Sequence, residues 1–106
     1  MKQELNVIDS PNDSVSCASL LKVLADETRL AVVRQLMQAP HLVGELNDAI
    51  DVEQSLLSHH LRVLRDANIV TAERVGKAVR YALAPHVAAA RSKKGLDLGC
   101  CKLVFE

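Results

Sequence analysis

The chain has almost no aromatic residues. Of its 106 residues one is Tyr, one is Phe and none is Trp, although 49% are hydrophobic. A core must therefore be built from Leu, Val and Ala, a composition that favours helical packing. A chain of this length is expected to form one small domain. Its modest core makes dimerisation a natural way to bury more surface.

Long apolar runs and a secretion signal are also missing. No run approaches the ~20 residues needed to span a bilayer, and the segment from Met1 to Ser16 is polar and acidic, unlike a signal peptide. We therefore expect a cytoplasmic protein with no membrane partner, whose cysteines (Cys17, Cys100 and Cys101) are reduced. The sequence has no Cys-x-x-Cys, no cofactor loop and no obvious general base near Cys100-Cys101, so we do not expect an enzyme such as a small reductase.

The formal net charge is zero, but the charges are segregated along the chain. Residues 1–53 hold four basic and nine acidic side chains, whereas residues 54–94 hold eight basic and two acidic ones. Basic charge is thus concentrated in one segment, as an electrostatic footprint on DNA requires.

Hydrophobic spacing predicts helices in the first two thirds of the chain. A first helix, capped by Ser14 or Ser16, contains Leu20 to Leu24, and a second is capped by Asp26 and stopped by Pro40. A third helix over about 42–49 and a fourth, capped by Asp51 and running to about Ala67, follow so closely that they predict a helix-turn-helix.

After Asn68 the pattern alternates, which predicts two strands over 69–75 and 78–83 joined by a turn at Gly76-Lys77. A final helix is expected from Pro85 to about Gly95. The predicted fold class is mainly α with a small β-hairpin wing, a winged helix-turn-helix. The expected divisions are a flexible arm over residues 1–13, a DNA-binding and dimerisation domain over residues 14–95, and a tail with the Cys pair over residues 96–106.

The fourth helix has two distinct faces when its residues are placed at about 100° intervals. One arc is apolar, with His60 in its middle as a core histidine whose ring nitrogen is satisfied, and it includes Leu56, Leu57, Leu61, Val63 and Leu64. The opposite arc carries amide, hydroxyl, imidazole and guanidinium groups, which read base edges and hold phosphates. The predicted contacts with DNA on this helix are Gln54, Ser55, Ser58, His59 and Arg62.

The wing adds further predicted phosphate or minor-groove contacts at Arg74, Lys77 and Arg80. Val79, Tyr81 and Leu83 alternate and are expected on one face of the strand. Arg80 is expected on the other face, near Arg74 and Lys77, and Tyr81 is expected in the core.

Three segments together resemble the ArsR/SmtB family of small dimeric bacterial repressors. They are Leu24-Ala25-Asp26-Glu27-Thr28-Arg29-Leu30, then Ser55-x-x-Ser58-x-His60-Leu61-x-x-Leu64, then Arg74-x-Gly76-Lys77-x-Val79-x-Tyr81-x-Leu83. The resemblance covers roughly residues 17–84. It implies a homodimer built through the first and last helices. That dimer would bind an imperfect palindrome in double-stranded operator DNA without a cofactor and dissociate when an inducer binds.

The inducer is expected at the cysteines. The third helix lacks the Cys-x-Cys of arsenite and cadmium sensors, and after Pro85 only His86 could serve as a zinc ligand. Cys100 and Cys101 suit a thiophilic centre such as trivalent arsenic, and some arsenic-responsive relatives carry a similar pair. Methylarsenite would need this pair alone. Arsenite would need a third sulfur, for which Cys17 is the only candidate, in a site across the dimer interface.

Other interpretations stay open at this point. The same repressor could respond to persulfide, peroxide or disulfide stress through Cys17 with Cys100 or Cys101, or to cadmium, lead or bismuth. Cys17 could equally be a small buried core residue. The chain could also be a dimerisation module that does not bind DNA.

Overall fold

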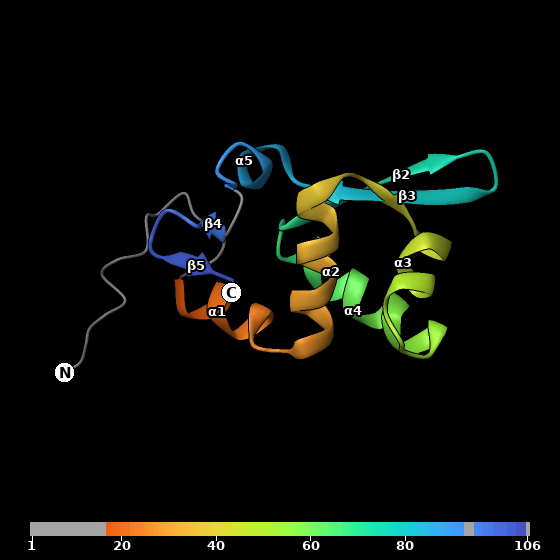
Figure 1. Cartoon of the computed structure of the whole chain (residues 1–106), viewed down its shortest axis with the longest axis horizontal. Coiled ribbons are helices and arrows are strands. Elements are labelled where there is room, and N and C mark those ends of the chain that lie inside the picture. Colours follow the sequence, from red (N-terminus) through yellow and green to blue (C-terminus); the bar gives the residue numbers. More distant parts are fainter. Residues whose placement is uncertain (1–16, 93–94, 106) are drawn as a thin grey trace.

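The computed structural model describes residues 17–92 and 95–105, which form helices packed on a small sheet and a separate two-stranded hairpin (Figure 1). The helices are α1 (Cys17–Leu24), α2 (Glu27–Gln38), α3 (Val43–Ala49), α4 (Gln54–Asp66) and α5 (Pro85–Ala88). The strands are β1 (His41–Leu42), β2 (Val70–Val75), β3 (Ala78–Leu83), β4 (Gly95–Asp97) and β5 (Lys102–Val104). No helix among the described residues is long and apolar enough to cross a membrane.

The predicted helix-turn-helix is present in α3 and α4, with α2 packed against α4. The Asp26 side chain caps α2 as expected, by accepting a hydrogen bond of 3.0 Å from the Arg29 backbone N–H. The prediction that Asp51 caps α4 is wrong. The helix begins two residues later, after Glu53, whose side chain makes no capping bond to the backbone.

The wing follows the sequence prediction closely. Strands β2 and β3 pair antiparallel from Val70↔Leu83 to Val75↔Ala78, and β1 adds to the other edge of β3 to give the order β1-β3-β2. Gly76 adopts a φ of 63° at the turn, a backbone conformation that residues other than glycine rarely adopt. The β2–β3 hairpin projects from the helices (Figure 1).

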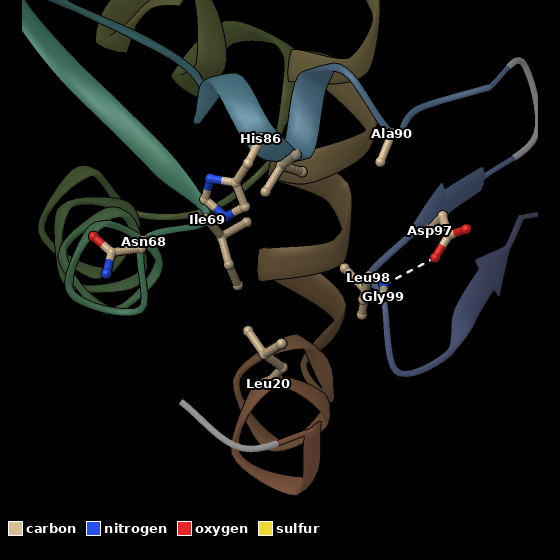
Figure 2. Close-up of a pocket in the computed structure, with 9 residues that line it drawn as sticks. Leu20, Asn68, Ile69, His86, Ala90, Asp97, Leu98 and Gly99 are labelled. Atoms are coloured by element: carbon tan, nitrogen blue, oxygen red, sulfur yellow. Dashed lines mark hydrogen bonds between the residues drawn. The ribbon is translucent and has the colours of Figure 1, made fainter. Parts of the chain in front are cut away.

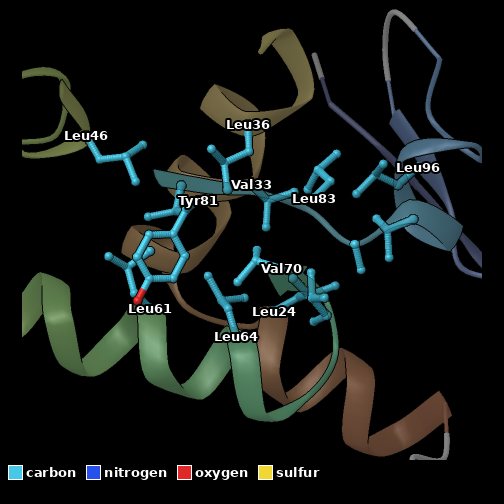
Figure 3. Packing of buried hydrophobic residues seen from close by; sticks show 14 of the residues in the cluster. Leu24, Val33, Leu36, Leu46, Leu61, Leu64, Val70, Tyr81, Leu83 and Leu96 are labelled. Atoms are coloured by element: carbon cyan, nitrogen blue, oxygen red, sulfur yellow. The ribbon is translucent and has the colours of Figure 1, made fainter. Parts of the chain in front are cut away.

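The core is almost entirely aliphatic, as the scarcity of aromatic residues requires. Figure 3 shows side chains from α1, α2, α4 and the wing converging on one cluster. Tyr81 is buried within it, which confirms its predicted core role. The labelled members are Leu24, Val33, Leu36, Leu46, Leu61, Leu64, Val70, Tyr81, Leu83 and Leu96.

The prediction of a last helix reaching Gly95 is wrong. Helix α5 ends at Ala88, and residues 95–105, here called the cysteine hairpin, form β4, a turn and β5 beside α1 (Figure 1). The pairing Leu96↔Leu103 puts Leu96 in the core at 2% exposure. Gly95 approaches β5 so closely that a Cβ there would overlap the carbonyl oxygen of Leu103. Burial of Leu96 and this close approach override the helix propensity of the alanines before them.

Candidate functional site

Helix α4 exposes the side chains that the sequence assigned to DNA contact. Leu57, Leu61 and Leu64 are at most 1% exposed and hold the helix on the core. The opposite face is solvent-exposed and presents Gln54, Ser55, Ser58, His59 and Arg62. The prediction that α4 has a buried apolar face and an exposed polar face is therefore correct for most of its residues.

Two details of this face differ from the sequence prediction. Leu56, expected on the apolar arc, is 45% exposed. The Ser55 hydroxyl donates a hydrogen bond of 2.7 Å to Glu53 Oε1. An acidic group therefore stands at the start of α4, the helix expected to read DNA, just before residues 54–65, which include no acid.

His60 is buried, as predicted, but its ring is not fully satisfied. Its Nε2 lies 3.9 Å from Asp26 Oδ1, too far for a hydrogen bond, and its Nδ1 has no partner. Asp26 thus stands between the start of α2 and the buried face of α4.

Asp26 is expected to make folding pH-dependent. The Arg29 backbone N–H holds the pKa of Asp26 below its ordinary value, with smaller lowering effects from His60 and the Arg29 guanidinium, against a raising effect of partial burial. Because this pKa is depressed in the folded state, the stabilisation is present above the ordinary aspartate pKa and is lost as the pH falls through the folded value.

The matched variants are Asp26→Ala and Asp26→Asn. Alanine removes the cap and should lower the free energy of unfolding at neutral pH by about 1 kcal/mol, whereas asparagine keeps a cap without a charge. Urea unfolding at pH 7 and pH 3 measures both. The stability gap between wild type and Asp26→Asn should shrink at pH 3, and a gap that stays constant would contradict the assignment.

The wing divides its basic residues between two faces. Cross-strand pairing sets Arg74 opposite Val79 and Arg80 opposite Glu73, so Arg74 and Arg80 lie on different faces and the expected grouping of the two is wrong. Arg80 Nη2 is 2.8 Å from Glu73 Oε1, an exposed ion pair that offsets its charge. Arg74 and Lys77 are exposed and make no ion pair with any described residue.

The three cysteines meet in one cluster within a single chain. Cys17 and Cys100 form a disulfide, with Cα atoms 5.9 Å apart. The sulfur of Cys101 is free and lies 3.8 Å from that of Cys17. All three sulfurs lie within 4.8 Å of one another.

The cluster corrects two expectations. Reduced cysteines were expected, whereas the structure pairs Cys17 with Cys100 in a disulfide, at a Cα separation usual for one. A site that joins Cys17 to the pair does not need a second protomer, because α1 and the cysteine hairpin of one chain supply all three sulfurs.

A tight turn directs both vicinal cysteines toward α1. The Leu98 N–H donates to the Cys101 carbonyl at 2.8 Å, and Gly99 has a φ of 91°. Asp97 Oδ1 accepts a hydrogen bond of 2.8 Å from the Gly99 N–H. The segment pairs as a hairpin and packs against the rest of the chain through Leu96 and Leu103.

A pocket of about 430 Å³ adjoins this turn (Figure 2). Leu20 of α1, Ile69 after α4 and His86 of α5 line it from three sides, and Leu98 and Gly99 line the side nearest the cysteines. The lining therefore joins elements from both ends of the described chain.

The cysteine hairpin also contacts α2. The Arg34 guanidinium carbon lies 5.1 Å from the centre of the Phe105 ring, a cation–π contact. Leu103 packs against the core cluster. Because α2 packs against α4, this contact connects the thiol cluster to the scaffold of the reading helix.

The known proteins that this chain resembles are transcriptional regulators. "HTH-type transcriptional repressor SmtB" of Mycobacterium tuberculosis is 45% identical over 71 residues, which cover 67% of this chain and 53% of the relative. "Arsenical resistance operon repressor" of Escherichia coli is 41% identical over 75 residues, covering 70% and 64%. This chain thus spans between half and two thirds of the length of these two proteins.

A third relative is matched over most of its length. "Transcriptional activator HlyU" of Vibrio cholerae is 33% identical over 79 residues, which cover 74% of this chain and 73% of the relative. A solved structure of HlyU from Vibrio cholerae superposes with a TM-score of 0.66 at 33% identity, covering 76% of this chain and 88% of that chain.

The family assignment agrees with the winged helix-turn-helix described above. The sequence pattern of "Bacterial regulatory protein, arsR family" matches residues 26–72, from the cap of α2 into β2. The named relatives are regulators and not enzymes. The chain belongs to the arsR family of bacterial regulatory proteins.

Proposed function

We propose that this protein is a homodimeric transcriptional repressor that binds double-stranded operator DNA and leaves it when a trivalent arsenical binds Cys17, Cys100 and Cys101. The observation that carries the choice of inducer is the cluster of three sulfurs within 4.8 Å in one chain. DNA binding is supported by the exposed face of α4 and by its family membership.

The DNA contacts in this proposal come from two elements. Gln54, Ser55, Ser58, His59 and Arg62 of α4 face the major groove, where amide, hydroxyl and guanidinium groups read base edges or hold phosphates. Arg74, Lys77 and Arg80 of the wing contact phosphate or the minor groove, with Arg74 and Arg80 approaching from opposite faces of the wing. The ion pair of Arg80 with Glu73 makes it the weakest of the three contacts.

The arrangement of the sulfurs suits trivalent arsenic. All three lie within 4.8 Å of one another, so after reduction of the disulfide one pyramidal centre can reach three thiolates. A cellular dithiol first reduces the Cys17–Cys100 disulfide, supplying two electrons and two protons. Arsenous acid, As(OH)₃, then reacts with the three thiols: three As–S bonds replace three As–O bonds, and the hydroxyls leave with the thiol protons as three waters.

Release from DNA follows from the contacts of the cysteine hairpin. When the three sulfurs bind arsenic, the turn over residues 98–101 changes position. Leu103 and Phe105 of the cysteine hairpin transmit this movement to α2, and α2 in turn displaces α4, which packs against it. In a dimer the two reading helices then no longer match both half-sites. A coupling of only ~2–3 kcal/mol between the two sites would be enough.

A second candidate signal is oxidation of the same thiols. The specific observation in its favour is the Cys17–Cys100 disulfide, which links α1 to the cysteine hairpin. In this version a disulfide, formed by an oxidant or a persulfide, replaces the arsenic centre as the bridge that repositions the hairpin.

The test is fluorescence anisotropy of the reduced protein on DNA from its own upstream region, titrated with arsenite, methylarsenite, Zn²⁺ and a persulfide donor. Wild type should be released by arsenite. Cys17→Ser should lose the arsenite response but keep release by methylarsenite, which needs only two sulfurs, and Cys100→Ser with Cys101→Ser should ignore both.

Each competing signal gives a distinct result in that titration. Release by the persulfide donor alone would establish the redox version, and release by Zn²⁺ in the double variant would place the sensing site elsewhere. Failure of reduced wild type to bind any DNA would contradict the repressor itself.

A further inference from the structure

Leu56 is an exposed leucine on the reading helix. It is 45% exposed, whereas Leu57, Leu61 and Leu64 of the same helix are at most 1% exposed. It is also outside the set of partly buried residues that pack against the core cluster. Its side chain therefore contributes little to holding α4 on the protein.

A single exposed leucine is ordinary on a protein surface, so exposure alone does not indicate a function and the position of the residue must be considered. Leu56 is the third residue of α4 and lies next to His59 around the helix. In helix-turn-helix proteins the N-terminal residues of the second helix are the ones that contact base edges. Leu56 therefore lies where sequence is read.

The chemistry of the side chain limits what it can recognise. Leucine has no hydrogen-bonding group, so it cannot read the donors and acceptors of a base edge. The apolar group that B-DNA presents in the major groove is the C5 methyl of thymine. The exposed side chain would lose water contact when α4 docks, and a methyl group is the partner that makes this burial favourable.

We propose that Leu56 reads the C5 methyl of one thymine in each half-site of the operator. The inference rests on the proposed function, because it requires that α4 enter the major groove. It adds a direct preference for thymine over cytosine at one position, made by apolar contact beside polar readers. The helix around it has no acid from Gln54 to Arg65, which favours a polyanion over a protein partner at this surface.

The test removes the methyl from the DNA. A duplex is first selected from a randomised library by the wild-type protein, and each thymine is then replaced in turn by deoxyuridine, which differs only by that methyl. Replacement of the contacted thymine in one half-site should weaken wild-type binding by about fourfold, the effect of losing one buried methyl. In Leu56→Ala the same replacement should have no effect.

The matched control is Leu21→Ala, which truncates a leucine that is 41% exposed on α1. It should keep the full sensitivity to deoxyuridine, whatever it does to overall affinity. Leu56→Met, which keeps an apolar side chain, should also keep it. Leu56→Ser provides the comparison if the alanine variant fails to fold, as judged by circular dichroism.

Two results would overturn the inference while leaving DNA binding intact. One is a wild type that tolerates deoxyuridine at every thymine. The other is an equal loss in Leu56→Ala or Leu56→Ser and in wild type. If wild type selects no duplex at all, the proposed function fails together with this inference.

Discussion

Replacing Gly95 with alanine is expected to displace the cysteine hairpin and abolish the response to arsenite. The added Cβ would overlap the Leu103 carbonyl oxygen, and this is backbone that β4–β5 pairing holds in place. Separating the strands withdraws Leu96, 2% exposed, from the core. The free energy of unfolding should fall by about 2–5 kcal/mol, the range for losing a buried leucine.

The matched control is Gly44→Ala. A Cβ on Gly44 meets nothing within 4 Å, and Gly44 lies within α3, where alanine is favoured by up to about 1 kcal/mol. Urea unfolding and the anisotropy titration measure both variants. An unchanged stability and arsenite response in Gly95→Ala would show that the hairpin does not hold the thiol cluster.

Replacing Arg62 with alanine is expected to weaken operator binding by about 1–3 kcal/mol, a loss of about 5- to 150-fold, if its guanidinium reads a base. Arg62 is exposed in the middle of α4, and no described residue forms an ion pair with it. Truncating it should leave folding unchanged, because surface substitutions rarely alter stability by more than about 0.5 kcal/mol.

Arg80→Ala is the comparison for Arg62→Ala. Glu73 already occupies one face of that guanidinium at 2.8 Å, so removing it should cost less affinity. Anisotropy at several salt concentrations separates phosphate from base contacts, because loss of a phosphate contact lowers the salt dependence. Unchanged affinity in a folded Arg62→Ala would remove Arg62 from the interface.

Local sequence signals predicted the helix-turn-helix and the wing well. The Asp26 cap, the turn at Gly76 and the alternation from Val79 to Leu83 each depend on a few neighbouring residues. The apolar and polar faces of α4 could also be predicted, because helix geometry alone determines which residues share a face. The cap at Asp51 failed because any of several polar residues before Gln54 can stand at the helix start.

The cysteine hairpin was not predictable in the same way. Its alanine-rich approach favours a helix locally, while the pairing of Leu96 with Leu103 and the disulfide between Cys17 and Cys100 depend on contacts made only in the folded chain. The separation of Arg74 from Arg80 could have been predicted, because the expected two-residue turn at Gly76-Lys77 already sets Arg74 opposite Val79 and Arg80 opposite Glu73. The exposure of Leu56 depends on which edge of the apolar arc the core leaves uncovered.

Under the proposed function, the order of the elements along the chain separates DNA recognition from inducer sensing. The family pattern and the wing occupy the uninterrupted stretch over residues 26–83, whereas the sulfurs come from segments on either side of it, 83 residues apart for Cys17 and Cys100. The two flanks can therefore be varied while the stretch between them is kept, provided that the core residues Leu24 and Leu96 are retained. Under the proposed function, a library that varies the remaining residues of 17–24 and 95–105 would search for new inducers on one fixed operator.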